Sequence, residues 1–80
     1  MQNFMEQIHY YGNGYVAYYV GVSGSTYYRE GILHNIHWYE LHKYGVIYKT
    51  YSTCQPTRSV SSFDRVKEDK LVIEIFKNFV

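Results

Sequence analysis

The sequence predicts an α+β fold, in which a small antiparallel sheet of about four to five strands carries a C-terminal helix packed on one face. The length of 80 residues allows one small domain, and 46% of the residues are apolar. Aromatic and β-branched residues dominate 1–53, whereas apolar residues follow helical spacing over 61–80. We therefore treat 1–80 as a single domain, with 54–60 as a polar connecting loop.

The first two strands are predicted around a turn. Gly12-Asn13-Gly14 is a strong turn signal, so a strand is expected over 7–11 and a second over 15–22. Alternation along the second strand separates two sets of side chains: Val16, Tyr18, Val20 and Val22 on one face, and Tyr15, Ala17, Tyr19 and Gly21 on the other.

A further turn is predicted at Ser23-Gly24 or Gly24-Ser25, from which a strand over 26–30 returns. If Ser23-Gly24 is the turn, Tyr19 faces Tyr28. The pairing would place two tyrosines side by side on the outer face of the sheet.

Residues 32–44 fit either a helix or a strand. As a helix, the segment ends before Gly45, which suits a C′ position. As a strand, it sends Trp38 and Tyr39 to opposite faces and leads through a hairpin into a strand over 46–53. The strand is favoured, because Asn, His, Trp and Tyr are mediocre helix formers and no good N-cap residue precedes the segment. The choice decides whether Trp38 belongs to the core or to a contact surface.

The last segment, 61–80, predicts a helix. Ser61 or Ser62 can cap it, and Asp64 in the first turn suits the helix dipole. A terminal strand over 71–76 is the alternative. In a helix, apolar residues form a stripe on one side: Phe63, Val66, Ile73, Phe76 and Val80. The stripe is widened by Leu71, Val72, Ile75 and Phe79.

The charge balance argues against nucleic acid and membranes as partners. The formal net charge is +1, so no strong field attracts phosphates or anionic lipids. No apolar run approaches the roughly 20 residues of a membrane helix. Residues 1–7 lack the pattern of a signal peptide, and the single cysteine leaves no disulfide within the chain. A cytoplasmic location is expected, which is the host cytoplasm if a phage encodes the protein.

Tyrosine is the most informative residue type. All eleven tyrosines lie between Tyr10 and Tyr51. Core filling explains about half of them, but adjacent pairs in a strand send one ring outward. Exposed tyrosines offer rigid contact area and an adaptable hydroxyl, as in antibody paratopes. The residues predicted to contact a partner are Tyr15, Tyr19, Tyr28, Arg29, His34, Trp38, Tyr39 and Tyr48.

Neither a metal site nor a catalytic site is predicted. His34, His37, His42 and Cys54 would suffice for zinc, but their spacing matches no common zinc motif. No nucleophile motif such as G-x-S-x-G occurs, and the two glycines flanking Asn13 form only part of a phosphate-binding loop. The expectation is a protein that is not an enzyme and has no cofactor.

The predicted function is stoichiometric binding of a protein or nucleoprotein complex through a neutral sheet face rich in Tyr and His. Small size, a composition typical of AT-rich genes and the absence of catalytic motifs suggest a phage or mobile-element inhibitor of a host defence or nucleic-acid enzyme, for example an anti-CRISPR protein. Two alternatives are a single-stranded nucleic-acid-binding protein, which the charge disfavours, and a structural homo-oligomer. The favoured function implies a monomer or a weak dimer.

Overall fold

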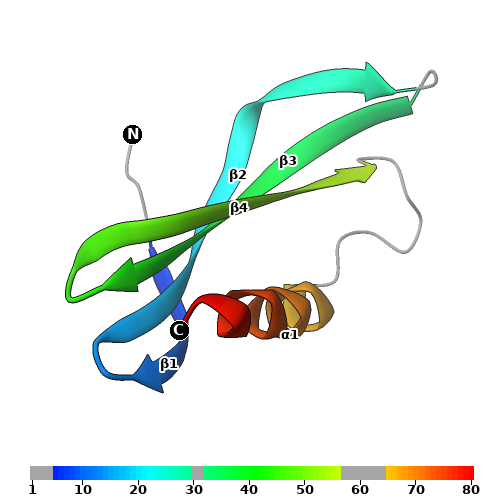
Figure 1. The fold of residues 1–80 in the computed structure, drawn as a ribbon. Helices are drawn as coiled ribbons and strands as arrows, with labels where there is room; N and C mark the ends of the chain where they lie inside the picture. Colours follow the sequence, from blue (N-terminus) through cyan, green and yellow to red (C-terminus); the bar gives the residue numbers. More distant parts are fainter. Residues whose placement is uncertain (1–4, 30–31, 57–64) are drawn as a thin grey trace.

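The computed structural model shows an antiparallel sheet with a C-terminal helix on one face (Figure 1). It describes the backbone of residues 5–29, 32–56 and 65–80. Side chains are described over 5–22, 35–53 and 65–80. Over these ranges the predicted α+β class is confirmed.

In the described ranges, four strands form one sheet and pair in sequence order, each antiparallel to the next. Such a meander requires only short connections between neighbouring strands, in agreement with the turn signals in the sequence. The elements are β1 (Glu6–Gly12), β2 (Tyr15–Arg29), β3 (Ile32–Lys43), β4 (Val46–Pro56), α1 (Arg65–Phe76) and a 3-10 helix, η1 (Lys77–Phe79).

Two tight turns lie together at one end of the sheet. Asn13-Gly14 joins β1 to β2, and Tyr44-Gly45 joins β3 to β4. All four residues have positive φ, 56° and 84° in the first turn and 51° and 82° in the second. This is the conformation of type I′ turns, which suit two-residue hairpins. The Tyr44 N–H donates to the Gly14 carbonyl at 2.8 Å, and the Tyr44 ring occupies the space that a Cβ at Gly14 would need.

The turn predicted at Ser23-Gly24 is wrong. The chain stays in β2 through these residues, and Tyr19 pairs with Tyr39 of β3 instead of with Tyr28. Glycine and serine in a strand mark irregularities as well as turns, and the sequence pattern alone does not separate the two.

The Ser-Gly-Ser segment instead disturbs the pairing of β2 with β3. The register shifts between Val22 and Thr26, and a smaller shift lies between Tyr19 and Gly21. Extra residues in one strand bend it and increase its twist. Figure 1 shows β2 bending within its cyan part.

The segment that fitted a helix or a strand is a strand, Ile32–Lys43, and its hairpin leads into β4 as predicted. However, β4 continues to Pro56, past the predicted start of the loop 54–60. Pro56 pairs with His34 at the end of this edge strand. Proline is tolerated there because an edge strand has one side with no ladder partner.

The predicted helix over 61–80 is present as α1 followed by η1. Its expected first turn, with Ser61, Ser62 and Asp64, lies outside the described residues. No helix in the part of the chain that the structure describes is long and apolar enough to cross a membrane.

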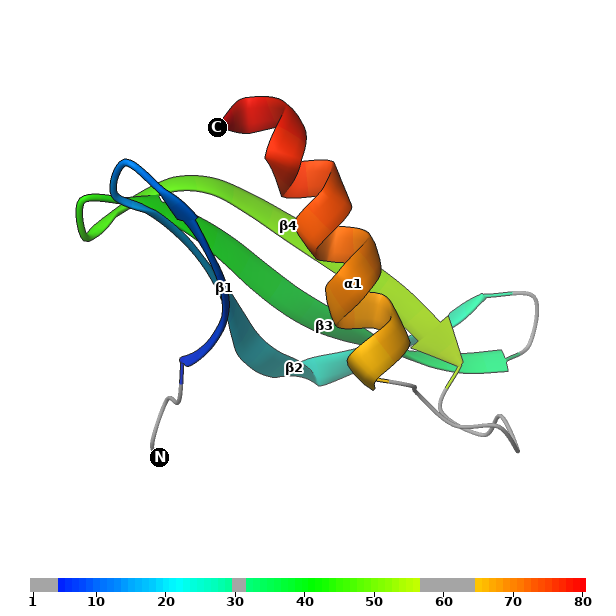
Figure 2. The ribbon, with the colours of Figure 1, turned by 90° about the horizontal axis from the view of Figure 1, so that it is seen from below.

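A small core lies between the sheet and α1, which crosses the strands obliquely (Figure 2). Its buried members are Ala17, Tyr39, Leu41, Val72 and Phe76, with Ile8, Tyr11, Tyr15, Tyr19 and Tyr51 packed around them. In α1, Val72 and Phe76 are buried, whereas Val66 and Leu71 of the predicted stripe are exposed. The apolar stripe of the helix is therefore wider than its contact with the sheet.

Candidate functional site

Cross-strand pairing divides the side chains between two faces of the sheet, because opposite residues in a ladder project to the same side. One face packs against α1, and we call it the covered face (Figure 2). Its paired residues with described side chains are Glu6, His9, Gly12, Tyr15, Ala17, Tyr19, Val22, Asn35, His37, Tyr39, Leu41, Lys43, Val46, Lys49, Tyr51 and Thr53.

The opposite side of the sheet has no element packed on it in the described part of the chain, and we call it the open face. Its paired residues with described side chains are Gln7, Tyr10, Val16, Tyr18, Gly21, Ile36, Trp38, Glu40, His42, Ile47, Thr50 and Ser52. Trp38 on β3 and Tyr10 and Ile47 on the edge strands are exposed. A surface with these three side chains in view is suited to bind a partner.

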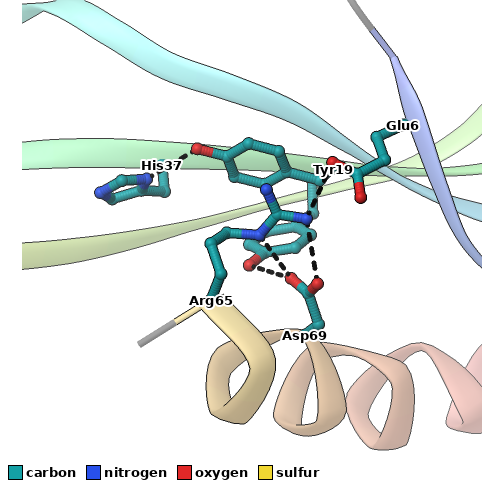
Figure 3. Close-up of polar contacts among 6 residues, drawn as sticks. Glu6, Tyr19, His37, Arg65 and Asp69 are labelled. Carbon is teal, nitrogen blue, oxygen red and sulfur yellow. Dashed lines mark hydrogen bonds and ion pairs between the residues drawn. The ribbon is translucent and has the colours of Figure 1, made fainter. Parts of the chain in front are cut away.

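Arg65 fixes the start of α1 to the covered face (Figure 3). Its guanidinium donates to Asp69 through Nε at 3.1 Å and through Nη2 at 3.0 Å. Nη2 also reaches Oε1 of Glu6 on β1, at 3.2 Å. The guanidinium carbon lies 3.7 Å from the centre of the Tyr19 ring on β2, within cation–π range. Burial lowers the pKa of Arg65, but the hydrogen bonds to Asp69 and Glu6 outweigh this effect and raise it.

Two tyrosine hydroxyls complete this cluster. The fully buried Tyr39 donates its hydroxyl to Oδ1 of Asp69 at 2.8 Å, and burial followed by this hydrogen bond raises its pKa well above the ordinary value. The hydroxyl of Tyr19 lies 3.0 Å from Nδ1 of His37. Burial, and then the charge of Arg65, lower the pKa of His37. The cluster therefore holds the helix on the sheet with charge-assisted hydrogen bonds.

The open face contains its own polar pair, on the central strand β3. Nε2 of His42 donates to Oε1 of Glu40 at 2.8 Å, and the His42 ring packs against that of Tyr18 with 4.6 Å between centroids. His42 is 7% exposed although no helix covers this side, because neighbouring side chains enclose it. The pair gives the open face a fixed carboxylate beside aromatic rings.

Three predicted contact residues lie on the covered face. The prediction that Tyr39 contacts a partner is wrong, since its side chain is fully buried under α1. Tyr15 and Tyr19 are partly buried around the core, and the Tyr19 ring is in contact with Arg65. The outward orientation expected for them is thus corrected. A helix packs closely where a small residue leaves room, and Ala17 between the two tyrosines provides that room.

Of the other predicted contact residues, two are exposed, and three lie near the loop that joins β2 to β3. Trp38 lies exposed on the open face, and Tyr48 is exposed beside Tyr15, with ring centroids 5.8 Å apart. The side chains of Tyr28, Arg29 and His34 lie outside the described residues, as do any contacts they make.

Sequence reasoning did not select Tyr10, Tyr18, Glu40, His42 and Ile47 as members of the candidate surface. Alternation of side chains along a strand could have identified two of them, because Glu40 and His42 share a face with Trp38 in any extended conformation. What the sequence lacked was a reason to assign the helix to the opposite side.

The histidines considered as metal ligands do not converge. His37 belongs to the covered face, where it meets Tyr19, and His42 belongs to the open face, where it meets Glu40. His34 and Cys54 have no described side chain. Among the described residues, no group of three or more potential ligand side chains could hold a metal ion.

Comparison with known proteins adds no relative to this description. No protein-family model matches the chain, and neither a curated protein nor a solved structure is significantly similar to it.

Proposed function

We propose that the protein binds one protein partner stoichiometrically through the open face. The observation that supports this proposal best is the contrast between the covered face, where the core lies, and the open face, where Tyr10, Trp38 and Ile47 are exposed. Trp38 is 40% exposed, and Tyr10 and Ile47 are more than half exposed. Tyr and Trp are enriched where protein interfaces derive most of their binding energy.

The shape of the molecule supports a surface function. The described chain measures 43 × 27 × 17 Å, so it is a thin slab with a broad side on each face. α1 covers one broad side, which is therefore occupied by a contact within the chain. A partner lying on the other broad side would bury Tyr10, Trp38 and Ile47 together.

The charges on the two faces make nucleic acid the weaker candidate. A nucleic-acid platform combines stacking rings with a basic track for phosphates. The lysines Lys43 and Lys49 belong to the covered face, where their ammonium groups lie over the rings of Tyr15 and Phe79. On the open face, Glu40 is the only Asp, Glu, Lys or Arg among the paired residues that the structure describes. This face would repel a phosphate backbone.

The proposal is tested by affinity purification from a cell lysate with three versions of the tagged chain. The wild type and the control Leu71→Ala, which alters an exposed residue of α1, should retain the same protein in about 1:1 ratio. Trp38→Ala should lose it. Retention should persist at about 0.5 M salt, because an aromatic interface depends little on screened charge.

Three other results contradict the proposal. A protein retained equally by Trp38→Ala binds elsewhere. A partner lost at moderate salt and replaced by nucleic acid identifies a nucleic-acid-binding surface. A stable dimer of the wild type, but not of Trp38→Ala, in light scattering assigns the open face to self-association. The narrower prediction, inhibition of a host defence or nucleic-acid enzyme by a phage-encoded protein, depends on the identity of the retained partner.

A further inference from the structure

We infer that the partner places an arginine side chain on the open face, with its guanidinium against the Trp38 ring and paired with the Glu40 carboxylate. This inference rests on the proposed protein-binding function and names the chemistry of its central contact. It follows from three features of the open face and from one arrangement on the covered face.

Glu40 is a fixed carboxylate with unused hydrogen-bonding capacity. Its Oε1 accepts from His42, and its Oε2 accepts no hydrogen bond from the residues that the structure describes. The side chain is 20% exposed, which leaves it open to solvent on one side only. A carboxylate has room for about four donors, so a partly buried one with a single partner favours a further donor. Removal from water strengthens its attraction for a cation.

Trp38 is the neighbour of Glu40 on the open face, and small residues flank it on the adjacent strands. The two residues are two positions apart on β3 and share a face, a separation of about 6.5–7 Å. The cross-strand neighbours of Trp38 are Gly21 on β2 and Ser52 on β4, both small. Nothing lies within 4 Å of the position that a Cβ at Gly21 would occupy. A planar group can therefore enter beside the indole, which is the best cation–π acceptor among side chains.

Among the residues whose side chains the structure describes, the open face has no lysine or arginine that could pair with Glu40. Tyr18 and Thr50 flank Glu40 on the neighbouring strands, and neither provides a positive charge. His42 already directs Nε2 to Oε1 and packs against Tyr18, so it orients the carboxylate. Among the described residues, the site thus has an acceptor and a ring but no lysine or arginine to complete it.

The covered face shows how the same parts are used when a cation is present. There, Arg65 lies 3.7 Å from the centre of the Tyr19 ring and donates twice to Asp69. This contact, together with apolar burial, docks α1 on the sheet. On the open face, Trp38 provides the ring and Glu40 the carboxylate for a similar contact with an arginine. Arginine suits it better than lysine, because its planar guanidinium stacks and bonds in two directions at once.

The first test uses the free chain and a small probe, N-acetyl-arginine amide, with the citrulline analogue as its neutral isostere. The sequence contains a single tryptophan, so the indole N–H signal of Trp38 in a ¹H–¹⁵N spectrum is unambiguous. The arginine probe should shift this signal with a millimolar dissociation constant, and citrulline should bind at least about fivefold more weakly. Equal shifts with both probes, or no shift at about 50 mM arginine probe, overturn the inference.

Two variants localise the effect. Glu40→Gln keeps an acceptor for His42 but removes the charge, and it should reduce arginine binding at least about fivefold. Glu74→Gln removes the same charge from an exposed position of α1 and should leave binding unchanged. Circular dichroism confirms that both are folded. Undiminished arginine binding by Glu40→Gln contradicts the inference.

The same two variants separate this inference from the proposed function. With the purified partner, Glu40→Gln should raise the dissociation constant about tenfold, whereas Glu74→Gln should not. If Trp38→Ala abolishes partner binding while Glu40→Gln has no effect, the open face binds a partner but not through an arginine. If Trp38→Ala also has no effect, the proposed function itself fails.

Discussion

The two faces of the sheet carry similar side chains, tyrosines with a few charged groups. They differ in how far these side chains are buried and in how many partners the charged groups have. On the covered face, Tyr39 is buried and hydrogen-bonded to Asp69, and Arg65 has a ring and two carboxylates as partners. On the open face, Trp38 is exposed and Glu40 pairs only with His42 among the described residues. Tyrosine content therefore does not distinguish a core face from a contact surface. Whether a helix packs on the face does.

The largest expected difference between the faces is the cost of removing an apolar side chain. Phe76→Ala should lower the free energy of unfolding by about 3–5 kcal/mol, because Phe76 is buried between α1 and the sheet. The total for a domain of this size is about 4–12 kcal/mol, so at least about a quarter of the stability depends on this residue. Ile47→Ala on the open face should cost less than about 1 kcal/mol. Urea denaturation measures both, and equal losses would mean that the open face is buried in solution.

The next effect concerns the polar cluster that docks the helix. Asp69→Ala should cost about 2–3 kcal/mol, since it leaves the buried Tyr39 hydroxyl without its acceptor and Arg65 without its main partner. Tyr39→Phe should cost about 1 kcal/mol, and the double variant should cost less than the sum. Glu74→Ala, in the exposed part of α1, is the control. Additive losses in chemical denaturation would show that the two groups do not act together.

A smaller effect is expected at alkaline pH. Burial, and then the charge of Glu74, raise the pKa of Tyr11 to about 12, while its hydroxyl donates to the Ile73 carbonyl at 2.7 Å. The unfolded chain titrates near pH 10, so the stabilisation is complete below about pH 10 and is lost as pH rises towards the folded pKa.

The unfolding free energy of the wild type should therefore fall between about pH 10 and 12, and Tyr11→Phe should show a shallower fall. Tyr10→Phe, at an exposed position of the open face, is the matched control. Denaturation at a series of pH values provides the measurement. An unchanged slope in Tyr11→Phe would refute the assignment of this titration to Tyr11.

The smallest effect on stability is expected for a polar substitution on the open face. Tyr10→Ser should change the free energy of unfolding by no more than about 0.5 kcal/mol, because its ring is 57% exposed. Thermal denaturation at several protein concentrations measures it. A loss above about 2 kcal/mol that grows with dilution would instead indicate that this face is covered by a second copy of the chain.

Much of the fold follows from local signals. Gly12-Asn13-Gly14 predicts the first turn because type I′ geometry requires residues that accept positive φ, and the observed angles agree. The strand assignment of 32–43 follows from the poor helix propensity of its residues. Ser23-Gly24 failed as a turn because the same residues are compatible with an irregular strand, and only pairing with β3 distinguishes the two.

The candidate site was only partly predictable. Alternation along β3 assigns Trp38 and Glu40 to one side of the sheet and Tyr39 to the other, since it is a local property of the extended chain. Alternation does not determine on which side of the sheet the helix packs. That choice depends on contacts between distant segments, such as Arg65 with Glu6 and Tyr39 with Asp69.

The sequence by itself determined the α+β class, the turn between the first two strands and a tyrosine-rich sheet of nearly balanced charge. These properties arise from composition, turn chemistry and periodicity, each of which acts over a few residues. Only the tertiary structure decided that Tyr39 is fully buried while its neighbour Trp38 is 40% exposed. The two residues have similar chemistry, and their fates differ because α1 packs on one side of β3, where Val72, Phe76 and Asp69 can be accommodated.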